Sequence, residues 1–221
     1  MTAMNNKSKT TADKLWDKVE NGEELTRSQK ARYESTKALL ELAKLIPWGE
    51  KIEDNNHVII DDKNRKIPLE PSSVKVSYTS RYNARCGYYN HQKLLLFKMN
   101  TDFWMNRNRS DKFGTLAHEL VHIRIQNHSP EFWDILKMFL KIFAKNQDEV
   151  ESIMGGNIDF EEVKDRTLNS IHSGSVDRRS ESVREREDKM REVKDYGFKY
   201  GNESKIPSVD TISQISADKE E

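Results

Sequence analysis

Along the first fifty residues, apolar side chains recur with the period of an α-helix. The segment from Thr11 to Val19 gathers apolar residues on one face and stops near Gly22. A second helix is expected to begin at Thr26, where Thr-x-x-Gln is the capping-box pattern, and to end before Pro47. The pattern therefore predicts two N-terminal helices, and the second packs on a core through an apolar stripe that comprises Ala38, Leu39, Leu42, Ala43 and Ile46.

Short strand-like segments follow these helices. Residues 57–61 and 67–69 flank a polar stretch as the two strands of a hairpin would. Residues 74–78 alternate between apolar and polar positions, and Lys93 to Met99 is typical of a further strand. We expect these strands to form a small antiparallel sheet in front of the helices that come next.

Two more helices are predicted after the strands. Ser110 or Asp111 is expected to cap the first helix, which runs to about Gln126, and residues 132–143 form the second. Asn127 suits the left-handed conformation that ends a helix, and Ser129-Pro130-Glu131 suits the N-cap and first turn of a new one. Gly155-Gly156 then marks a break.

The first of these helices carries His118-Glu119-Leu120-Val121-His122, an H-E-x-x-H signature. Histidines four positions apart lie on one face of a helix, so His118 and His122 can bind the same cation. Glu119 lies about 100° round the helix from His118, where it can reach a water on the metal without being a ligand. The signature predicts a metal site in which Glu119 is the catalytic general base.

His128 is the expected third ligand. The helix must end before it, because His128 on a continuing helix would lie roughly 15 Å from the other two. A turn at Asn127 would deliver it back toward the metal; alternatively, a histidine at a helix boundary simply caps carbonyl groups. Three imidazoles suit one Zn²⁺ ion with an open fourth position. His57, His91 and His172 lack metal-ligand spacing and are expected to be surface or structural residues.

His118-Glu119-Leu120-Val121-His122 together with His128-Ser129-Pro130-x-Phe132-Trp133 resembles the YgjP-like zinc metallopeptidases, a family related to the SprT-like and WLM peptidases. The resemblance covers roughly residues 74–143. It implies a compact α+β fold of minimal zincin type, with the three histidines as zinc ligands and Glu119 as the catalytic residue. The family has Arg-Trp-Gly-Ser-Cys on the strand before the helix. This chain has Arg85-Cys86-Gly87-Tyr88-Tyr89, of which only Arg and Gly agree.

Length, composition and the family resemblance together predict three segments in the 221 residues. Residues 1–50 form an N-terminal helical extension, residues 51–168 the metallopeptidase domain, and residues 169–221 a charged tail that is disordered or a single helix. One cysteine excludes an intramolecular disulfide, and Cys86 is expected to be a small strand hydrophobe. The chain starts without a signal-peptide pattern and has no transmembrane run, so we expect a cytoplasmic protein without membrane contact.

Charge is distributed unevenly, although the net charge is zero. Residues 63–128 contain 12 Lys and Arg against 4 Asp and Glu, a net charge of +8, and tyrosines lie among these cations. Cations among stacking aromatic rings suit single-stranded nucleic acid, and they would equally suit an acidic peptide or a phosphorylated substrate. A solvated sheet face balanced by the acidic tail is the alternative.

These features together predict a zinc-dependent metallopeptidase that cleaves a protein or peptide, including nucleic-acid-associated proteins, with a metal-activated water and Glu119 as base. Two alternatives remain open. One is hydrolysis of another bond, such as a nucleotide pyrophosphate, which is associated with some YgjP-like proteins. The other is a non-catalytic zinc-containing binding module, although a structural site has no need of a base.

Overall fold

The computed structural model describes residues 9–53, 56–61, 64–89 and 94–172. Helices and two small sheets are mixed along the chain, so the fold is α+β, as predicted. The predicted tail at residues 169–221 lies outside the described residues, apart from its first four residues, which end the last helix.

The two N-terminal helices are confirmed. Helix α1 (Thr11–Glu20) is capped by Thr10, and α2 (Arg27–Leu45) is capped by Thr26 through the predicted capping box with Gln29. Gly22 has a φ of 70°, a left-handed conformation that glycine adopts at little cost, so the chain turns after α1 at this residue.

The first sheet contains strands β1 (Gly49–Glu53), β2 (Asn56–Ile60) and β3 (Lys66–Pro68), and all its pairs are antiparallel. The predicted hairpin corresponds to β2 and β3. Its turn is closed by the buried Asp61 carboxylate, which accepts from the Arg65 backbone N–H at 2.8 Å and from Arg65 Nε at 2.7 Å. Strand β1 was not predicted.

The second sheet contains β4 (Val74–Tyr78), β5 (Ala84–Tyr89) and β6 (Leu94–Met99) in the order β4-β6-β5. Strand β5 pairs with β6 antiparallel, but β4 pairs with β6 in parallel. The prediction of one antiparallel sheet is therefore corrected to two sheets, of which the second is mixed. The physical reason is that β4 and β5 bind opposite edges of β6, and an alternating pattern defines a strand's faces but not its neighbours.

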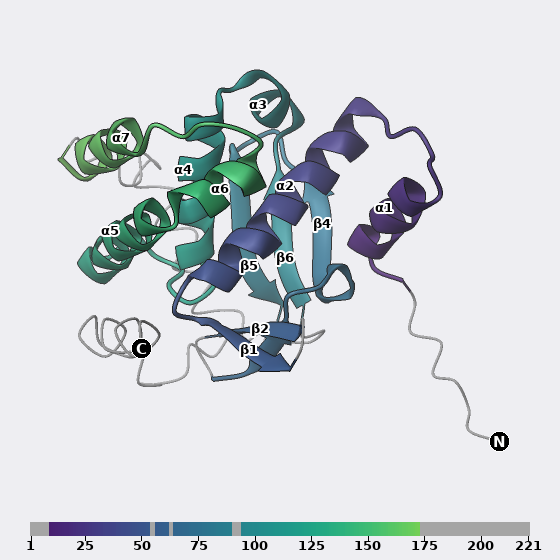
Figure 1. Cartoon of the computed structure of the whole chain (residues 1–221), viewed down its shortest axis with the longest axis horizontal. Coiled ribbons are helices and arrows are strands. Elements are labelled where there is room, and N and C mark those ends of the chain that lie inside the picture. Colours follow the sequence, from purple (N-terminus) through teal and green to yellow (C-terminus); the bar gives the residue numbers. More distant parts are fainter. Residues whose placement is uncertain (1–8, 54–55, 62–63, 90–93, 173–221) are drawn as a thin grey trace, which may run out of the picture.

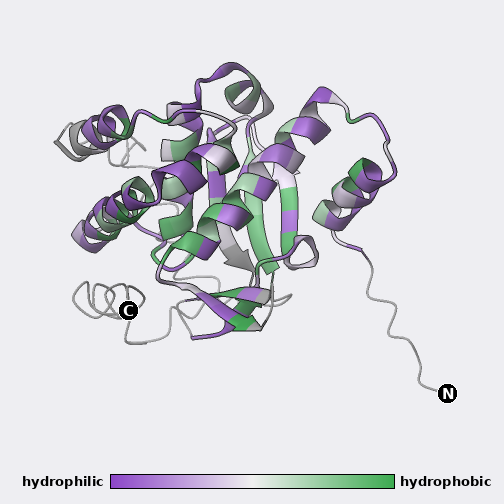
Figure 2. Ribbon diagram, in the orientation of Figure 1, coloured by the Kyte–Doolittle hydropathy of each residue, from purple (hydrophilic) through white to green (hydrophobic). Residues whose placement is uncertain are grey.

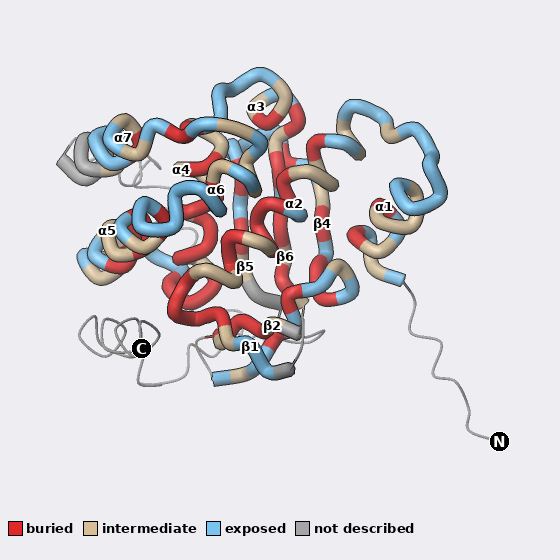
Figure 3. The backbone as a smooth tube through the Cα atoms, viewed as in Figure 1, coloured by how far each residue is buried: buried red, intermediate tan, exposed pale blue. Residues whose placement is uncertain are grey.

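The hydrophobic core lies between the second sheet and the helices. Helix α2 crosses one face of this sheet (Figure 1), and Val74, Val76, Leu95, Phe97 and Met99 on that face are buried. Figure 3 shows the resulting alternation along β4, and Figure 2 shows the matching alternation of hydropathy. One core cluster includes Leu39 and Leu42 of α2 together with Phe97, Phe113 and Phe139, so residues 1–50 share their core with residues 51–168.

Three helices frame the functional region. Helix α3 (Thr101–Asn106) leads into α4 (Arg109–Val121), and α5 (Pro130–Lys145) follows. Two predicted boundaries of α4 are wrong. Asn108, not Ser110 or Asp111, is the N-cap, since its side chain accepts from the Asp111 N–H at 2.7 Å. The helix also ends at Val121 rather than near Gln126.

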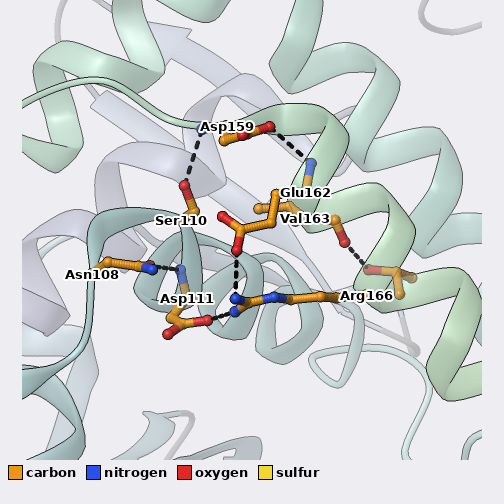
Figure 4. A network of polar contacts seen from close by, with 8 residues as sticks. Asn108, Ser110, Asp111, Asp159, Glu162, Val163 and Arg166 are labelled. Atoms are coloured by element: carbon orange, nitrogen blue, oxygen red, sulfur yellow. Dashed lines mark hydrogen bonds and ion pairs between the residues drawn. The ribbon is translucent and has the colours of Figure 1, made fainter.

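Helices α6 (Gln147–Met154) and α7 (Phe160–His172) complete the described chain, with the predicted break at Gly155, whose φ is 74°. Helix α7 binds α4 through the polar network of Figure 4. Ser110 Oγ accepts from the Asp159 N–H at 3.0 Å, and Arg166 forms ion pairs with Asp111 and Glu162. Across the described residues, no helix combines the length and apolar character needed to span a membrane.

Candidate metal centre

His118 and His122 project from the last turn of α4. His118 lies within the helix, and His122 is its C-cap with helical dihedral angles (φ −65°, ψ −11°). Their Nε2 atoms are 3.1 Å apart. The four-residue spacing therefore directs both imidazoles toward the same point, as the sequence predicts.

A hydrogen-bonded turn, rather than a left-handed residue, carries the chain out of α4. The Arg124 and Ile125 N–H groups both donate to the Val121 carbonyl, at 3.1 and 2.9 Å. Ile123 and Ile125 are buried, which anchors the turn to the core. Among described residues other than glycine, only Asn64 has a positive φ, so the expected left-handed conformation of Asn127 is wrong.

His128 completes the group from the start of α5. Ser129 caps α5 with Pro130 in its first turn, as predicted, and this start holds the preceding residue beside α4. His128 Nε2 lies 3.0 Å from His118 Nε2. The alternative that His128 merely caps carbonyl groups does not account for a ring nitrogen directed at two other imidazoles.

The orientation of His122 is fixed by the backbone. Its Nδ1 lies 2.8 Å from the Ile125 carbonyl oxygen, which can only accept, so Nδ1 carries the proton and donates. The lone pair is then on Nε2, the atom that faces His118. A hydrogen bond of this kind from the other ring nitrogen is the usual support for a metal-ligating histidine.

The three imidazoles could hold a metal ion. Nitrogen atoms that each bind zinc at about 2.0–2.1 Å in a tetrahedron lie about 3.3 Å apart. The Nε2 atoms of His122 and His128 lie 3.1 and 3.0 Å from that of His118, close to this separation. A cation compensates the mutual repulsion of converging lone pairs, so the donor set fits an imidazole-binding metal.

The electrostatic environment keeps His118 and His122 neutral, which metal binding requires. Burial is the main cause that lowers the pKa of His118 to about 3, and the neighbouring His122 and His128 contribute to this shift. Burial likewise lowers the pKa of His122 to about 4, and the positive charges of His128 and Arg85 act in the same direction. At neutral pH both rings offer a lone pair.

Phe132 and Trp133 form an aromatic wall against the three histidines. The fully buried Phe132 ring lies 4.7–4.8 Å from each imidazole, measured between ring centroids. Trp133 stacks on His128 at 5.7 Å. In the sequence, Phe132 and Trp133 were noted only as part of the family resemblance. The motif does not show that they pack against the histidines.

Glu119 is buried on the side of α4 that faces β5. Only 6% of the residue is exposed, and its Oε2 accepts a hydrogen bond from the Cys86 backbone N–H at 2.5 Å. Burial raises the pKa of this carboxyl to about 7, although the hydrogen bond and the charge of Arg85 oppose the shift. A base with a pKa near neutrality can both take and release a proton.

Cys86 is a buried residue of β5, as predicted for a small strand hydrophobe. Burial and the nearby Glu119 carboxylate raise the pKa of its thiol well above the ordinary value. The thiol is therefore protonated and a poor nucleophile at neutral pH. Its contribution to the site is its backbone N–H, which no pattern of side chains could have revealed.

The other two histidines that the structure describes belong to other elements. His57 lies on β2, His91 lies outside the described residues, and His172 ends α7. Within the described chain, His118, His122 and His128 are the one set of three potential ligands close enough to share an ion. No family model, curated protein or solved structure matches this chain.

Proposed function

We propose that the protein is a zinc-dependent hydrolase that cleaves peptide bonds, with His118, His122 and His128 as ligands and Glu119 as general base. Two observations carry the proposal together. Three imidazole nitrogens converge, and α4, which supplies two of them, also carries the buried carboxyl of Glu119. A purely structural site would be closed by a fourth protein ligand and would need no base. The three-histidine set leaves one position for a substrate or water.

Zinc fits this donor set because neutral imidazoles are among its preferred ligands and it needs no redox partner. When bound, zinc acts as a Lewis acid that polarises a carbonyl and lowers the pKa of water to about 7. The chain's own residues supply the remaining steps. Ile125 holds the His122 ring in place through Nδ1, and Phe132 excludes water from the rear of all three rings.

Glu119 is the residue that moves the proton. Cys86 holds Oε2, which leaves Oε1 to take a proton from the attacking water and to give it to the leaving amine. The raised pKa of about 7 suits this exchange near neutral pH. The nearby positive charge of Arg85, which lowers the pKa of Glu119, also favours negative charge on a reacting group.

A peptide substrate is supported by the position of β5 at the edge of its sheet. The Cys86 N–H points at Glu119 and therefore away from Phe97, its partner residue on β6. In an antiparallel pair, every second residue of a strand directs its backbone N–H and C=O away from the partner strand. The backbone groups of Ala84 and Tyr88 therefore also point away from β6. An extended peptide can pair with the part of this edge beyond Cys86, whose own N–H is donated to Glu119.

The test is hydrolysis by zinc-loaded protein carrying Glu119→Gln. We expect peptide cleavage to fall by roughly a hundredfold or more, because general-base catalysis contributes about that much, while zinc content stays equal to wild type. Undiminished cleavage by the variant would refute the proposed role. Phosphate release from nucleotides without any proteolysis by the wild-type protein would assign the centre to another bond.

A further inference from the structure

The second sheet has one face that no described helix covers. The buried residues on the helix side of the three strands are Val74, Val76, Ala84, Cys86, Leu95, Phe97 and Met99, whereas the alternate positions face outward. These outward positions form what we call the open face, which consists of Lys75, Ser77, Arg85, Gly87, Leu94, Leu96 and Lys98. Its charged side chains are exposed, and its leucines are half-buried.

The open face has positive charge and no acidic residue. Between Pro71 and Thr101 the sequence contains five Lys and Arg and no Asp or Glu. Three of those cations, Lys75, Arg85 and Lys98, lie on the open face. No ion pair connects any of the three to an acidic side chain within the described residues.

The strand register places two of these cations directly opposite one another. Arg85 of β5 pairs with Lys98 of β6, and Lys75 of β4 pairs with Leu96, two residues from Lys98. Like charges directly opposite one another on a sheet destabilise it. An anionic partner that binds across the three strands would compensate this repulsion.

The open face adjoins the metal centre. A side chain at Gly87 would point to within 3.8 Å of Gln126 Oε1, so the loop that carries His122 to His128 borders this face. Arg85 precedes Cys86, whose backbone N–H donates to Glu119 Oε2. A chain bound along the open face would therefore extend toward the proposed catalytic residues.

The side chains on this face suit an acidic polypeptide better than nucleic acid. Single-stranded nucleic acid needs aromatic rings on which its bases stack. Neither of the exposed tyrosines whose side chains the structure describes in this region lies on the face: Tyr78 shares the helix side with Val74 and Val76, and Tyr82 belongs to the following loop. Leucines between cations match a peptide with acidic and apolar residues.

We propose that the open face is a docking surface for an acidic stretch of the polypeptide substrate, with Lys75, Lys98 and Arg85 as its recognition residues. This inference rests on the proposed peptidase function, because it assigns the substrate class of the same centre. The acidic stretch binds across β4, β6 and β5 and delivers the adjoining bond to the metal centre.

The experiment measures binding of a fluorescein-labelled peptide rich in Glu and Leu, by anisotropy, to the full chain carrying Glu119→Gln so that no cleavage interferes. A second peptide with Gln in place of Glu is the neutral probe. Adding Lys75→Gln and Lys98→Gln should weaken binding of the acidic peptide by roughly fivefold or more, because each removes a surface charge pair. The effect should shrink as salt rises.

The matched control carries Lys37→Gln and Lys141→Gln, which remove two exposed cations from α2 and α5. We expect this control to bind as the parent does. Equal binding of the acidic and neutral peptides, or equal loss in both double variants, would overturn the proposal. Tighter binding of an oligothymidylate that depends on Lys75 and Lys98 would instead assign the face to nucleic acid.

The outcome separates this inference from the proposed function. Binding that depends on Lys75 and Lys98 in a protein that cleaves no peptide would leave a docking surface but refute the peptidase. Cleavage without such binding would refute the docking surface alone. In a catalytically intact background the two substitutions should raise KM for the acidic peptide and leave kcat unchanged, since neither lysine belongs to the metal centre.

Discussion

Burial acts in opposite directions on neighbouring residues of the metal centre. It raises the pKa of the Glu119 carboxyl to about 7 and lowers that of the His118 imidazole to about 3. The cause is the same in both cases, because a low-dielectric environment disfavours the charged form of each group. Two adjacent residues on one helix turn thus become a proton acceptor near neutrality and an uncharged ligand.

The raised pKa of Glu119 predicts a pH-dependent stability in metal-free protein. Between pH 4.5 and about 7 the folded chain retains a proton on Glu119 that the unfolded chain has released. Rising pH therefore favours unfolding across this window. Relative to Glu119→Gln, which cannot titrate, wild type should lose up to about 3 kcal/mol of unfolding free energy by pH 7 and little more above it.

Urea unfolding of both proteins at half-unit pH steps, with a chelator present, measures this difference. Parallel stability curves from pH 4.5 to 7.5 would mean that the Glu119 pKa is not raised by folding. Glutamine is a suitable replacement because it preserves shape and can still accept the Cys86 N–H hydrogen bond.

The sequence predicted the three imidazoles and the carboxyl of the centre but not the backbone groups that hydrogen-bond to them. His118, Glu119, His122 and His128 follow from spacing, because helix periodicity translates directly into position. The Ile125 carbonyl and the Cys86 N–H are backbone groups, which every residue type possesses. Their roles depend on where the chain turns and on which strand lies opposite α4. The local sequence specifies neither.

At the scale of elements, the end of α4 is where sequence and structure differ most. Ile123 and Ile125 continue an apolar pattern, which predicted a helix as far as Gln126. Both are buried, but in the turn that follows the helix. Periodicity records which side chains are buried and does not distinguish a helix from a buried turn. This early end is what brings His128 within reach of His118.

Helix α7 was not predicted, and its close packing on α4 can be tested at Gly114. A Cβ at Gly114 would lie 3.1 Å from Val163 Cγ1, one helical turn before His118. Gly114→Val should overfill this contact and cost about 2 kcal/mol of unfolding free energy, measured by urea denaturation. Val163→Ala in the same background should recover part of the loss.

The single Val163→Ala variant completes the double-mutant cycle. It should destabilise the protein by itself, since Val163 is buried, so recovery in the double variant would reveal direct coupling. Strictly additive effects would show that Gly114 and Val163 do not touch.

Across the whole molecule, the second sheet divides two environments. One face is buried by α2 and the hydrophobic core, and the other presents cations. The metal centre lies at the edge strand β5, where the turn after α4 meets the sheet. Part of the excess positive charge of residues 63–128 therefore lies on a surface next to the proposed catalytic residues.

The fold class followed from the sequence, whereas the arrangement of strands did not. Patterns at residues 57–61, 67–69, 74–78 and 93–99 correspond to β2, β3, β4 and β6. The parallel pairing of β4 with β6 depends on which edge each strand occupies, and that is decided by packing over the whole sheet. The family resemblance and the nucleic-acid partner stay predictions.

Zinc titration against a competing chromophoric chelator tests whether the three histidines hold one metal ion. The wild-type protein should bind one zinc ion, as should His57→Ala, whose substituted residue lies on β2. His128→Ala should keep its fold by circular dichroism but lose roughly a hundredfold or more in affinity. Unchanged zinc affinity in His128→Ala, or no zinc binding by the wild-type protein, would contradict the account.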